Sequence, residues 1–373
     1  MTLLSRKTLP LLLCVVFLCG CEKKQSDSVP SVRHDTSDFV MYTLNDALYF
    51  SFDEKDDLVL DERENTGLNC TFLHNYFKES DDYWYSVTSE DIAQELKVIQ
   101  IDKASLVLST SDTFSGGGFA SVGVFQNMFI HDISTYDYYE LIQHDEKFNL
   151  VRQNKFEHDA QMITVLDICE AGDRIYVLLG DESRHQWIQA LDSEMRETEV
   201  YAKPDEYATL LRMVSDGTKI WLTETNTRKE GEEVLSPAYR IISFNPTSGE
   251  FGEKTISLTD GYPYCIQYEA EQNVLLITHE PWGMNDAVWT VYDLDTGDKE
   301  VFRCSDLGYE YAQMYPFPFS AMGSDGSYYF YAQGSLYRVR INEGVVKKWN
   351  LSDYTDLFPH TIIFRQEHKD SKE

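Results

Sequence analysis

Carboxylate side chains recur at matching places along the chain. In five places a polar turn and a continuous apolar run are followed by an acid. The five acids are Glu90, Asp132, Asp181, Glu224 and Glu280. If the fold gathered them at one rim, they could bind Ca²⁺ or a basic ligand. The alternative is coincidence, because Asp and Glu make up 63 of the 373 residues and a short window often contains one.

A second candidate site is aromatic and lies in the polar segments between the apolar runs. Its residues are Trp187, Trp282, Tyr309 and Tyr311, with Arg228 and Lys229 as rare cations among acids. Aromatic side chains flanked by polar groups suit a sugar ring or an extended peptide. The alternative interpretation is that these side chains pack in or beside the core.

The chain lacks the local motifs of nucleophilic and zinc-dependent hydrolysis. It contains no G-x-S-x-G and no H-E-x-x-H, and its nine His residues are scattered. The pairs His131-Asp132 and His279-Glu280 are the one acid–base arrangement that recurs at equivalent positions. We therefore assign no catalytic residue, cofactor or metal, and Ca²⁺ at the acidic rim is the alternative.

The first twenty residues have the three parts of an export signal. Two basic residues precede an apolar run from Leu9 to Leu18, which is too short to span a bilayer as a stable helix. The segment Leu18-Cys19-Gly20-Cys21 resembles the lipobox of bacterial lipoproteins. The resemblance implies that Cys21 becomes the first residue and carries a lipid that anchors the chain to a membrane surface. The alternatives are an ordinary cleaved signal and an uncleaved anchor.

Four further cysteines are far apart and show no C-x-x-C spacing. They are Cys70, Cys169, Cys265 and Cys304. An even number in an exported protein permits disulfides. However, three of them lie in apolar runs, where a thiol behaves as a small hydrophobic group. Buried free thiols are therefore the favoured interpretation, and zinc is not expected.

Charge limits the possible partners. The net charge is −31, which repels nucleic acid and anionic lipid headgroups and favours cations, basic partners or simple solubility. Residues 22–37 are polar without an apolar period and are typical of a flexible tether. We therefore divide the chain into a signal peptide (1–20), a lipidated cysteine with a tether (21–37) and one folded domain (38–373).

The elements that must position these residues are short strands, and they repeat. An apolar strand that ends in Asp or Asn recurs seven times, at intervals of 43 to 53 residues. The terminal residues are Asp53, Asp102, Asp145, Asp192, Asn245, Asp293 and Asn342. Asp and Asn suit this place because their side chains bond nearby backbone and tolerate left-handed turns. Before most copies lie two further apolar runs, and continuous apolar strands suit sheets that are covered on both faces.

Four strands per repeat and seven repeats predict an all-β, seven-bladed β-propeller of four-stranded antiparallel blades. Residues 38–62 supply only three strands of a blade, and residues 360–367 supply one spare strand. The spare C-terminal strand is expected to complete the first blade and close the ring, which leaves few exposed sheet edges. The alternatives are a six- or eight-bladed ring and two stacked sandwiches.

Two strand–turn segments support this architecture by resemblance. Residues 292–302 (YDLDTGDKEVF) and 244–251 (FNPTSGEF) resemble the D-x-x-T-G turn of quinoprotein-like bacterial propellers. The domain is thus similar to quinoprotein-like and WD40-like propellers, although it has no repeated Trp-Asp pair. The turn alone implies no pyrroloquinoline quinone.

The sequence therefore predicts a lipid-anchored, extracytoplasmic, non-catalytic binding or scaffold protein. Its partner would be a protein, peptide or glycan of the cell envelope, beside the lipid bilayer itself, and a monomer is expected. Propellers carry ligands on the face that holds the loops between second and third strands and between blades, so the site is expected there. The alternative function is a glycan-active hydrolase or lyase, because a fold does not fix an activity.

Overall fold

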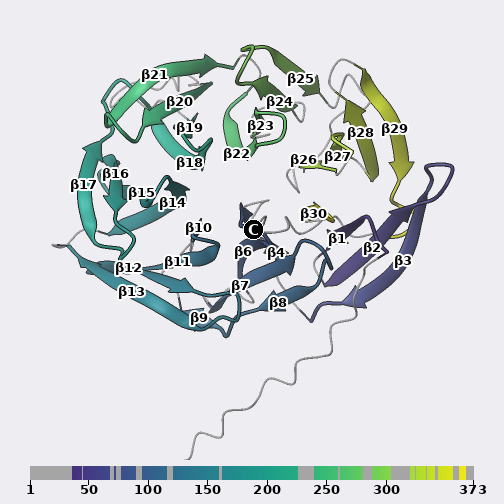
Figure 1. The fold of residues 1–373 in the computed structure, drawn as a ribbon, viewed down its shortest axis with the longest axis horizontal. Helices are drawn as coiled ribbons and strands as arrows, with labels where there is room; N and C mark the ends of the chain where they lie inside the picture. The colour runs from purple at the N-terminus through teal and green to yellow at the C-terminus, as the bar shows by residue number, and fades with distance from the viewer. Residues whose placement is uncertain are drawn as a thin grey trace, which may run out of the picture. The chain divides into compact units, whose positions relative to one another are not determined.

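The structure is a computed structural model of the chain. It describes residues 36–366, apart from 44, 68–70, 73–76, 90–94, 116–120, 159–161, 226–238, 259–260, 280–287, 304–319, 324, 333, 341–342 and 356–360. The described part is all-β and forms seven antiparallel blades around a ring, as predicted (Figure 1). Within these residues, no helix is long and apolar enough to cross a membrane.

The first blade combines strands from both ends of the chain, whereas the second and third are each continuous in sequence. The first contains β1 (Phe39–Tyr42), β2 (Asp46–Phe52), β3 (Leu58–Asn65) and β30 (Thr361–Phe364). The second contains β4 (Thr71–Phe72), β5 (Lys78–Glu79), β6 (Tyr83–Ser89), β7 (Glu95–Asp102), β8 (Leu108–Thr110) and β9 (Phe114–Ser115), where β4 and β5 share β6 as partner and β8 and β9 share β7. The third contains β10 (Val122–Phe125), β11 (Met128–Ser134), β12 (Tyr138–His144) and β13 (Leu150–Glu157).

The other four blades are each continuous in sequence. The fourth contains β14 (Ile163–Ala171), β15 (Arg174–Asp181), β16 (Gln186–Leu191) and β17 (Glu197–Ala202). The fifth contains β18 (Thr209–Ser215), β19 (Ile220–Thr225), β20 (Arg240–Asn245) and β21 (Glu250–Ser257). The sixth contains β22 (Pro263–Glu269), β23 (Val274–His279), β24 (Val288–Asp293) and β25 (Lys299–Arg303), and the seventh contains β26 (Ser320–Met322), β27 (Tyr328–Ala332), β28 (Ser335–Arg340) and β29 (Gly344–Asn350).

The C-terminal strand closes the ring, which confirms the prediction. β30 pairs antiparallel with β1, with Phe39 opposite Phe364 and Tyr42 opposite Thr361. The N–H of Arg365 continues the pairing by donating to the carbonyl of Asp38. In Figure 1 the purple and yellow ends of the chain meet in this blade.

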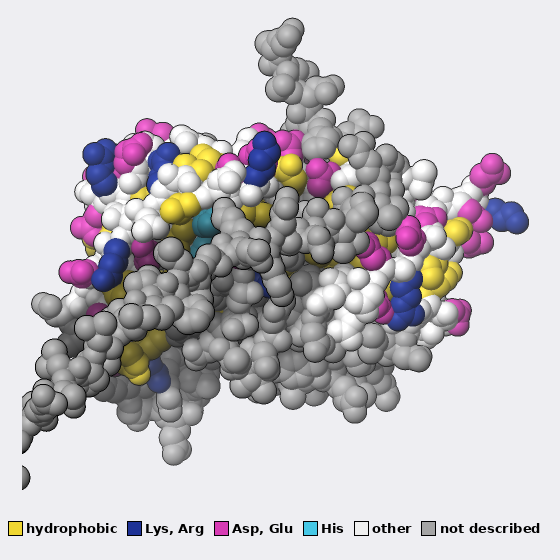
Figure 2. Space-filling view, turned by 90° about the horizontal axis from the view of Figure 1, so that it is seen from below, with side chains coloured by type: hydrophobic (Ala, Val, Ile, Leu, Met, Phe, Trp, Pro, Cys, Tyr) yellow, Lys and Arg dark blue, Asp and Glu magenta, His cyan; other side chains and the backbone are white. Residues whose placement is uncertain are grey.

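The core consists of layers between neighbouring blades. The described residues form seven apolar clusters, and each takes its side chains from two adjacent blades. The second strands are therefore covered on both faces, which explains their continuous apolar sequences. On the face shown in Figure 2, exposed Asp and Glu side chains are interspersed with Lys and Arg.

The repeated Asp and Asn residues cap the turns between third and fourth strands. In the fourth blade, Asp192 Oδ1 accepts the N–H groups of Glu194 and Arg196, both at 2.9 Å. Asp53, Asp102, Asp145, Asn245 and Asp293 likewise each accept two backbone N–H groups from residues two to four positions later, and Asn342 lies outside the described residues. Each turn contains a residue with positive φ, such as Met195 at 60° or Gly297 at 79°. The side-chain oxygen accepts the N–H groups that have no backbone partner in the turn, so in the six described turns the repeat residue marks the end of the third strand.

Candidate functional site

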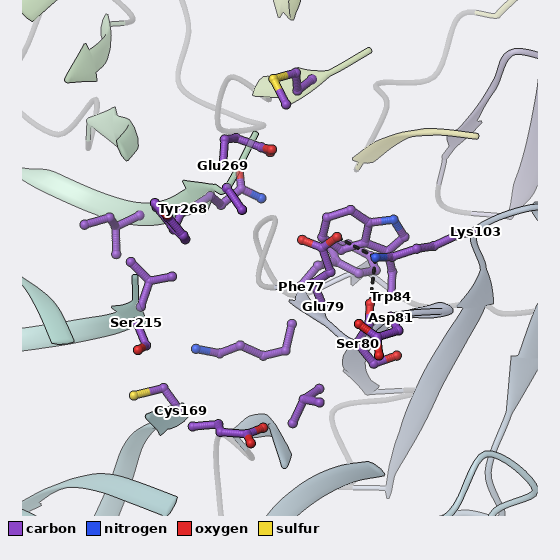
Figure 3. Close-up of a pocket in the computed structure, with 18 of the residues that line it drawn as sticks. Phe77, Glu79, Ser80, Asp81, Trp84, Lys103, Cys169, Ser215, Tyr268 and Glu269 are labelled. Atoms are coloured by element: carbon purple, nitrogen blue, oxygen red, sulfur yellow. Dashed lines mark hydrogen bonds and ion pairs between the residues drawn. The ribbon is translucent and has the colours of Figure 1, made fainter. Parts of the chain in front are cut away.

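A cavity of about 970 Å³ lies inside the ring (Figure 3). Its lining includes residues from all seven blades, mainly from the ends of the innermost strands. These strands end at the face that carries the turns between first and second and between third and fourth strands, which we call the turn face. The loop pattern in the sequence instead predicts binding at the opposite face, the loop face. Most loop-face candidates lie outside the described residues, and the cavity adds a site that sequence reasoning missed.

β-Bulges on three inner strands shape this cavity. The register shifts fall between Val165 and Asp167 in β14, between Leu210 and Met213 in β18, and between Pro263 and Cys265 in β22. A bulge inserts an extra residue, bends the strand and changes the direction of nearby side chains. Asp167, Arg212 and Cys265 lie at these bulges, and all three line the cavity.

Lys78 on β5 reaches from the second blade to the fourth and fifth. Its Nζ lies 2.9 Å from Asp167 Oδ1 on β14 and donates to the carbonyl oxygen of Met213 on β18, 3.1 Å away. Asp167 Oδ2 accepts the N–H of Met213 at 2.6 Å. The Lys78 side chain is 15% exposed and that of Asp167 is 1% exposed. Three blades therefore meet at one buried contact.

Burial moves the pKa values of both partners toward neutrality. Desolvation lowers the pKa of Lys78 to about 8. Desolvation also raises the pKa of Asp167 to about 7, although Arg212 and two backbone N–H groups act in the opposite direction. Desolvation works against both charged forms, but the 2.9 Å separation of Lys78 Nζ and Asp167 Oδ1 favours the ion pair. We call Lys78, Asp167 and Arg212 the floor cluster.

Arg212 belongs to the floor cluster by position and by charge. Its Nη1 donates to the carbonyl oxygen of Leu166, the bulged residue of β14, at 2.8 Å. Its charge acts on both partners of the ion pair, because it lowers the pKa of Lys78 and that of Asp167. The guanidinium side chain is half-buried, so solvent screens its field only in part.

Two thiols line the same cavity. Cys169 is buried, Cys265 is half-buried, and neither forms a disulfide. Burial raises the pKa of Cys169 to about 12 and that of Cys265 to about 11. Both are therefore protonated and uncharged near neutral pH. The prediction of a buried thiol outside any disulfide is confirmed for Cys169. Cys265 also forms no disulfide but is half-buried, and Cys70 and Cys304 lie outside the described residues.

The opening of the cavity is polar and aromatic. Lys103 forms an ion pair with Glu79 and donates to the carbonyl oxygen of Ser80 at 2.6 Å. Its Nζ lies 5.0 Å from the centre of the Trp84 ring, close enough for a cation–π contact. In Figure 3 these residues lie on one side of the cavity, and Tyr268 lies on the other.

Three acids at the opening, Asp81, Glu170 and Glu271, are here called the mouth acids. Asp81 and Glu271 are exposed and Glu170 is half-buried. Asn127 donates to Asp81 Oδ2 at 2.6 Å, and the N–H of Gln126 donates to Glu170 at 3.1 Å. These donors orient the carboxylates but bring no compensating positive charge.

Two carboxylates of the predicted acidic rim are buried, and each accepts a backbone N–H group just before an inner strand begins. Asp132 accepts the N–H of Ser121, immediately before β10. Glu224 accepts the N–H of Ala208, immediately before β18, at 2.6 Å and forms an ion pair with Arg240. Both acids occupy the same place in their blades, so the repeat has a clear structural role there.

The other predicted site residues are not brought together by the described structure. Asp181 accepts the N–H of His185 at 2.8 Å, within its own loop. Trp187 lies in β16, half-buried against the core between the third and fourth blades. The remaining candidates, Glu90, Glu280, Trp282, Tyr309, Tyr311, Arg228, Lys229 and Cys21, lie outside the described residues. A rim or an aromatic site at the loop face therefore stays a prediction.

The floor cluster had a partial signal in the sequence. Asp167 interrupts the apolar run ITVLDI, and Arg212 interrupts TLLRMV. A charged residue inside a buried strand requires a partner, and this signal could have been used. Lys78 gave no such signal, because it follows no apolar run and lies on a strand of only two residues.

No metal is assigned to this site. Among the described residues, no group of three or more His, Cys, Asp or Glu side chains is placed to hold a metal ion. The segment DLDTGD, residues 293–298, forms a turn in which Asp293 Oδ1 accepts the N–H groups of Asp295 and Thr296, both at 2.8 Å.

Comparison with known proteins identifies the architecture. No protein-family model and no curated protein matches the chain. A Lactobacillus plantarum protein superposes with a TM-score of 0.55 at 13% identity, over 88% of this chain and 100% of its own. The Pseudomonas aeruginosa periplasmic gluconolactonase PpgL superposes with a TM-score of 0.54 at 11% identity, over 88% of this chain and 99% of its own. A 6-phosphogluconolactonase candidate from Bacteroides fragilis superposes with a TM-score of 0.55 at 12% identity, over 89% of this chain and 99% of its own. At these identities the likeness shows the fold alone, which is a seven-bladed β-propeller.

Proposed function

We propose that this chain is a lipid-anchored, extracytoplasmic binding protein for a peptide, protein or glycan of the cell envelope. The lipobox-like segment ending at Cys21 supports the location, and the polar residues 22–37 would keep the propeller near its membrane. The observation that carries the binding role is the cavity of about 970 Å³, in which charged groups from different blades converge. Its size is typical of pockets for small ligands or for the end of a larger one.

The interactions of the floor cluster support binding rather than turnover. Lys78 bonds Asp167 and the Met213 carbonyl, and Asp167 also accepts a backbone N–H. A general base or nucleophile must contact the reacting atom within hydrogen-bond distance. Here the same groups hold blades together, so the cavity is preorganised as a receptor.

Photo-crosslinking in living cells tests this function. Benzoylphenylalanine would replace Tyr268 in the cavity wall, Trp282 in the predicted loop-face site, or Val200, which is 52% exposed on the outer strand β17. We expect an adduct with an envelope component from Tyr268 or Trp282 and none from Val200, identified by mass spectrometry. Equal adducts from all three positions, or none from any, would contradict a specific binding face.

One observation favours the alternative, a glycan-active hydrolase or lyase. Shifted pKa values beside a cavity mark catalytic groups in many enzymes, and Lys78 and Asp167 have such shifts. Purified protein would be incubated with envelope glycans and with a sugar lactone, and products would be measured by chromatography. Turnover by the wild type that is lost in Asp167→Asn would establish the enzyme and overturn the binding-only role. The binding role predicts that products form no faster with the protein than in buffer alone.

A further inference from the structure

The cavity separates positive from negative charge along its depth. The floor cluster contains two cations and one carboxylate, and its Asp167 side chain is 1% exposed. The two neighbouring thiols add no charge, because burial holds their pKa values at about 11 and 12. The floor therefore carries one net positive charge in surroundings that screen it poorly.

The mouth carries the opposite sign. The mouth acids Asp81, Glu170 and Glu271 are exposed or half-buried. Glu269 adds a further carboxylate to the lining. The nearby cations Lys103 and Arg365 form ion pairs with Glu79 and Asp38, so these pairs add little net charge. A free anion must therefore pass a negative mouth to reach the floor, whereas a free cation meets a positive floor.

We propose that the cavity binds a small zwitterion, such as a short peptide with free ends, with its carboxylate toward the floor cluster and its ammonium toward the mouth acids. This inference rests on the proposed function and names the ligand class of that site. The lining also contains Phe77, Val124 and Ile168, which offer apolar contact to the middle of such a ligand. A volume of about 970 Å³ leaves room for a peptide of a few residues.

Titration calorimetry with four forms of one dipeptide tests the proposal. The probes are alanyl-alanine, its N-acetyl form, its amide, and the form capped at both ends. We expect alanyl-alanine to bind and each singly capped form to bind at least tenfold more weakly. The doubly capped form should bind weakest, because it meets neither charged layer.

Matched variants test which charged group of the cavity contacts each end of the dipeptide. Arg212→Met removes the net positive charge of the floor and should abolish the preference for a free carboxylate. Glu271→Gln, on an exposed residue, should reduce the preference for a free amine without affecting folding. Arg196→Met, on an arginine whose side chain is 71% exposed in another turn, is the control and should change neither preference.

The outcomes separate this proposal from the proposed function. If the four forms bind alike, or if none binds while the Tyr268 crosslink still forms, the zwitterion proposal is wrong and the binding role remains. If no form binds and no crosslink forms at Tyr268 or Trp282, both fail.

Discussion

At the scale of single residues, buried charges connect the blades of this ring. Lys78 and Asp167 join three blades. Asp132 and Glu224 each bind the backbone at the entry to an inner strand. A buried charge is costly unless it is paired or well hydrogen-bonded. These residues therefore make stability depend on protonation, which is measurable.

Asp132 should make the protein less stable as the pH rises from 4 to 7. Burial raises the pKa of its carboxyl to about 7, although the Ser121 N–H and the Ser134 hydroxyl, at 2.6 Å, act in the opposite direction. A raised folded-state pKa gives stability that is complete below the unfolded value, about 4, and is lost as the pH rises through 7. The loss is at most about 1.4 kcal/mol per pH unit.

The test is Asp132→Asn, which imitates the protonated acid. Its melting temperature should exceed that of the wild type at pH 8 and should match it at pH 4. Asp137→Asn, on an exposed residue of the same blade, is the control. If Asp132→Asn had the same effect at both pH values, the carboxyl would already be ionised when the protein folds at pH 4.

At the scale of elements, the Asp-capped turns and the bulges have separate tasks. The turns end the third strands, and one of them carries Lys103 to the cavity mouth. The bulges interrupt the inner strands and direct charged side chains into the cavity. The turns therefore organise each blade, and the bulges organise the site.

Asp102→Ala should destabilise the second blade. Asp102 Oδ1 accepts the N–H of Ala104 at 3.1 Å and both the N–H and the hydroxyl of Ser105, at 2.7 and 2.8 Å. Loss of hydrogen bonds to a charged acceptor costs about 1–3 kcal/mol, which urea unfolding would detect. Asp102→Asn keeps an acceptor oxygen and should lose less than half as much. Equal losses for Asn and Ala would show that the turn does not depend on this oxygen.

The turns could be predicted from sequence and the bulges could not. An Asp or Asn after an apolar strand has a local cause, because its side chain bonds backbone two to four residues later. A bulge such as that at Asp167 is stabilised by partners in other blades, including Met213 and Lys78. Such partners are distant in sequence, so the fold was predictable, whereas of the cavity only the charges of Asp167 and Arg212 inside apolar runs left a signal.

At the scale of the whole molecule, the main structural feature is closure of the ring by the C-terminal strand β30. β30 buries Ile362, Ile363 and Phe364 between the first blade and its neighbours. The N–H of Gln366 then donates to the carbonyl of Lys103 in the second blade, at 2.9 Å. The last strand thus connects three blades.

Deletion of residues 360–373 should make the protein insoluble or expanded. Three buried side chains are lost, at about 2 kcal/mol each, and β1 becomes an exposed sheet edge. Size-exclusion chromatography and circular dichroism would report the change. Deletion of residues 367–373 keeps β30 and is the control. A soluble, cooperatively folded 360–373 deletion would contradict closure of the ring by this strand.

Location decides which partners the propeller can meet, so the proposed function depends on the lipid at Cys21. Intact-mass spectrometry of the protein extracted from membranes is the direct measurement. We expect a chain that begins at Cys21 and carries diacylglycerol. We expect the Cys21→Ser variant to be absent from the membrane fraction. A chain that begins at another residue, or one that begins at Cys21 without lipid, would contradict the anchor and with it the proposed role at the cell envelope.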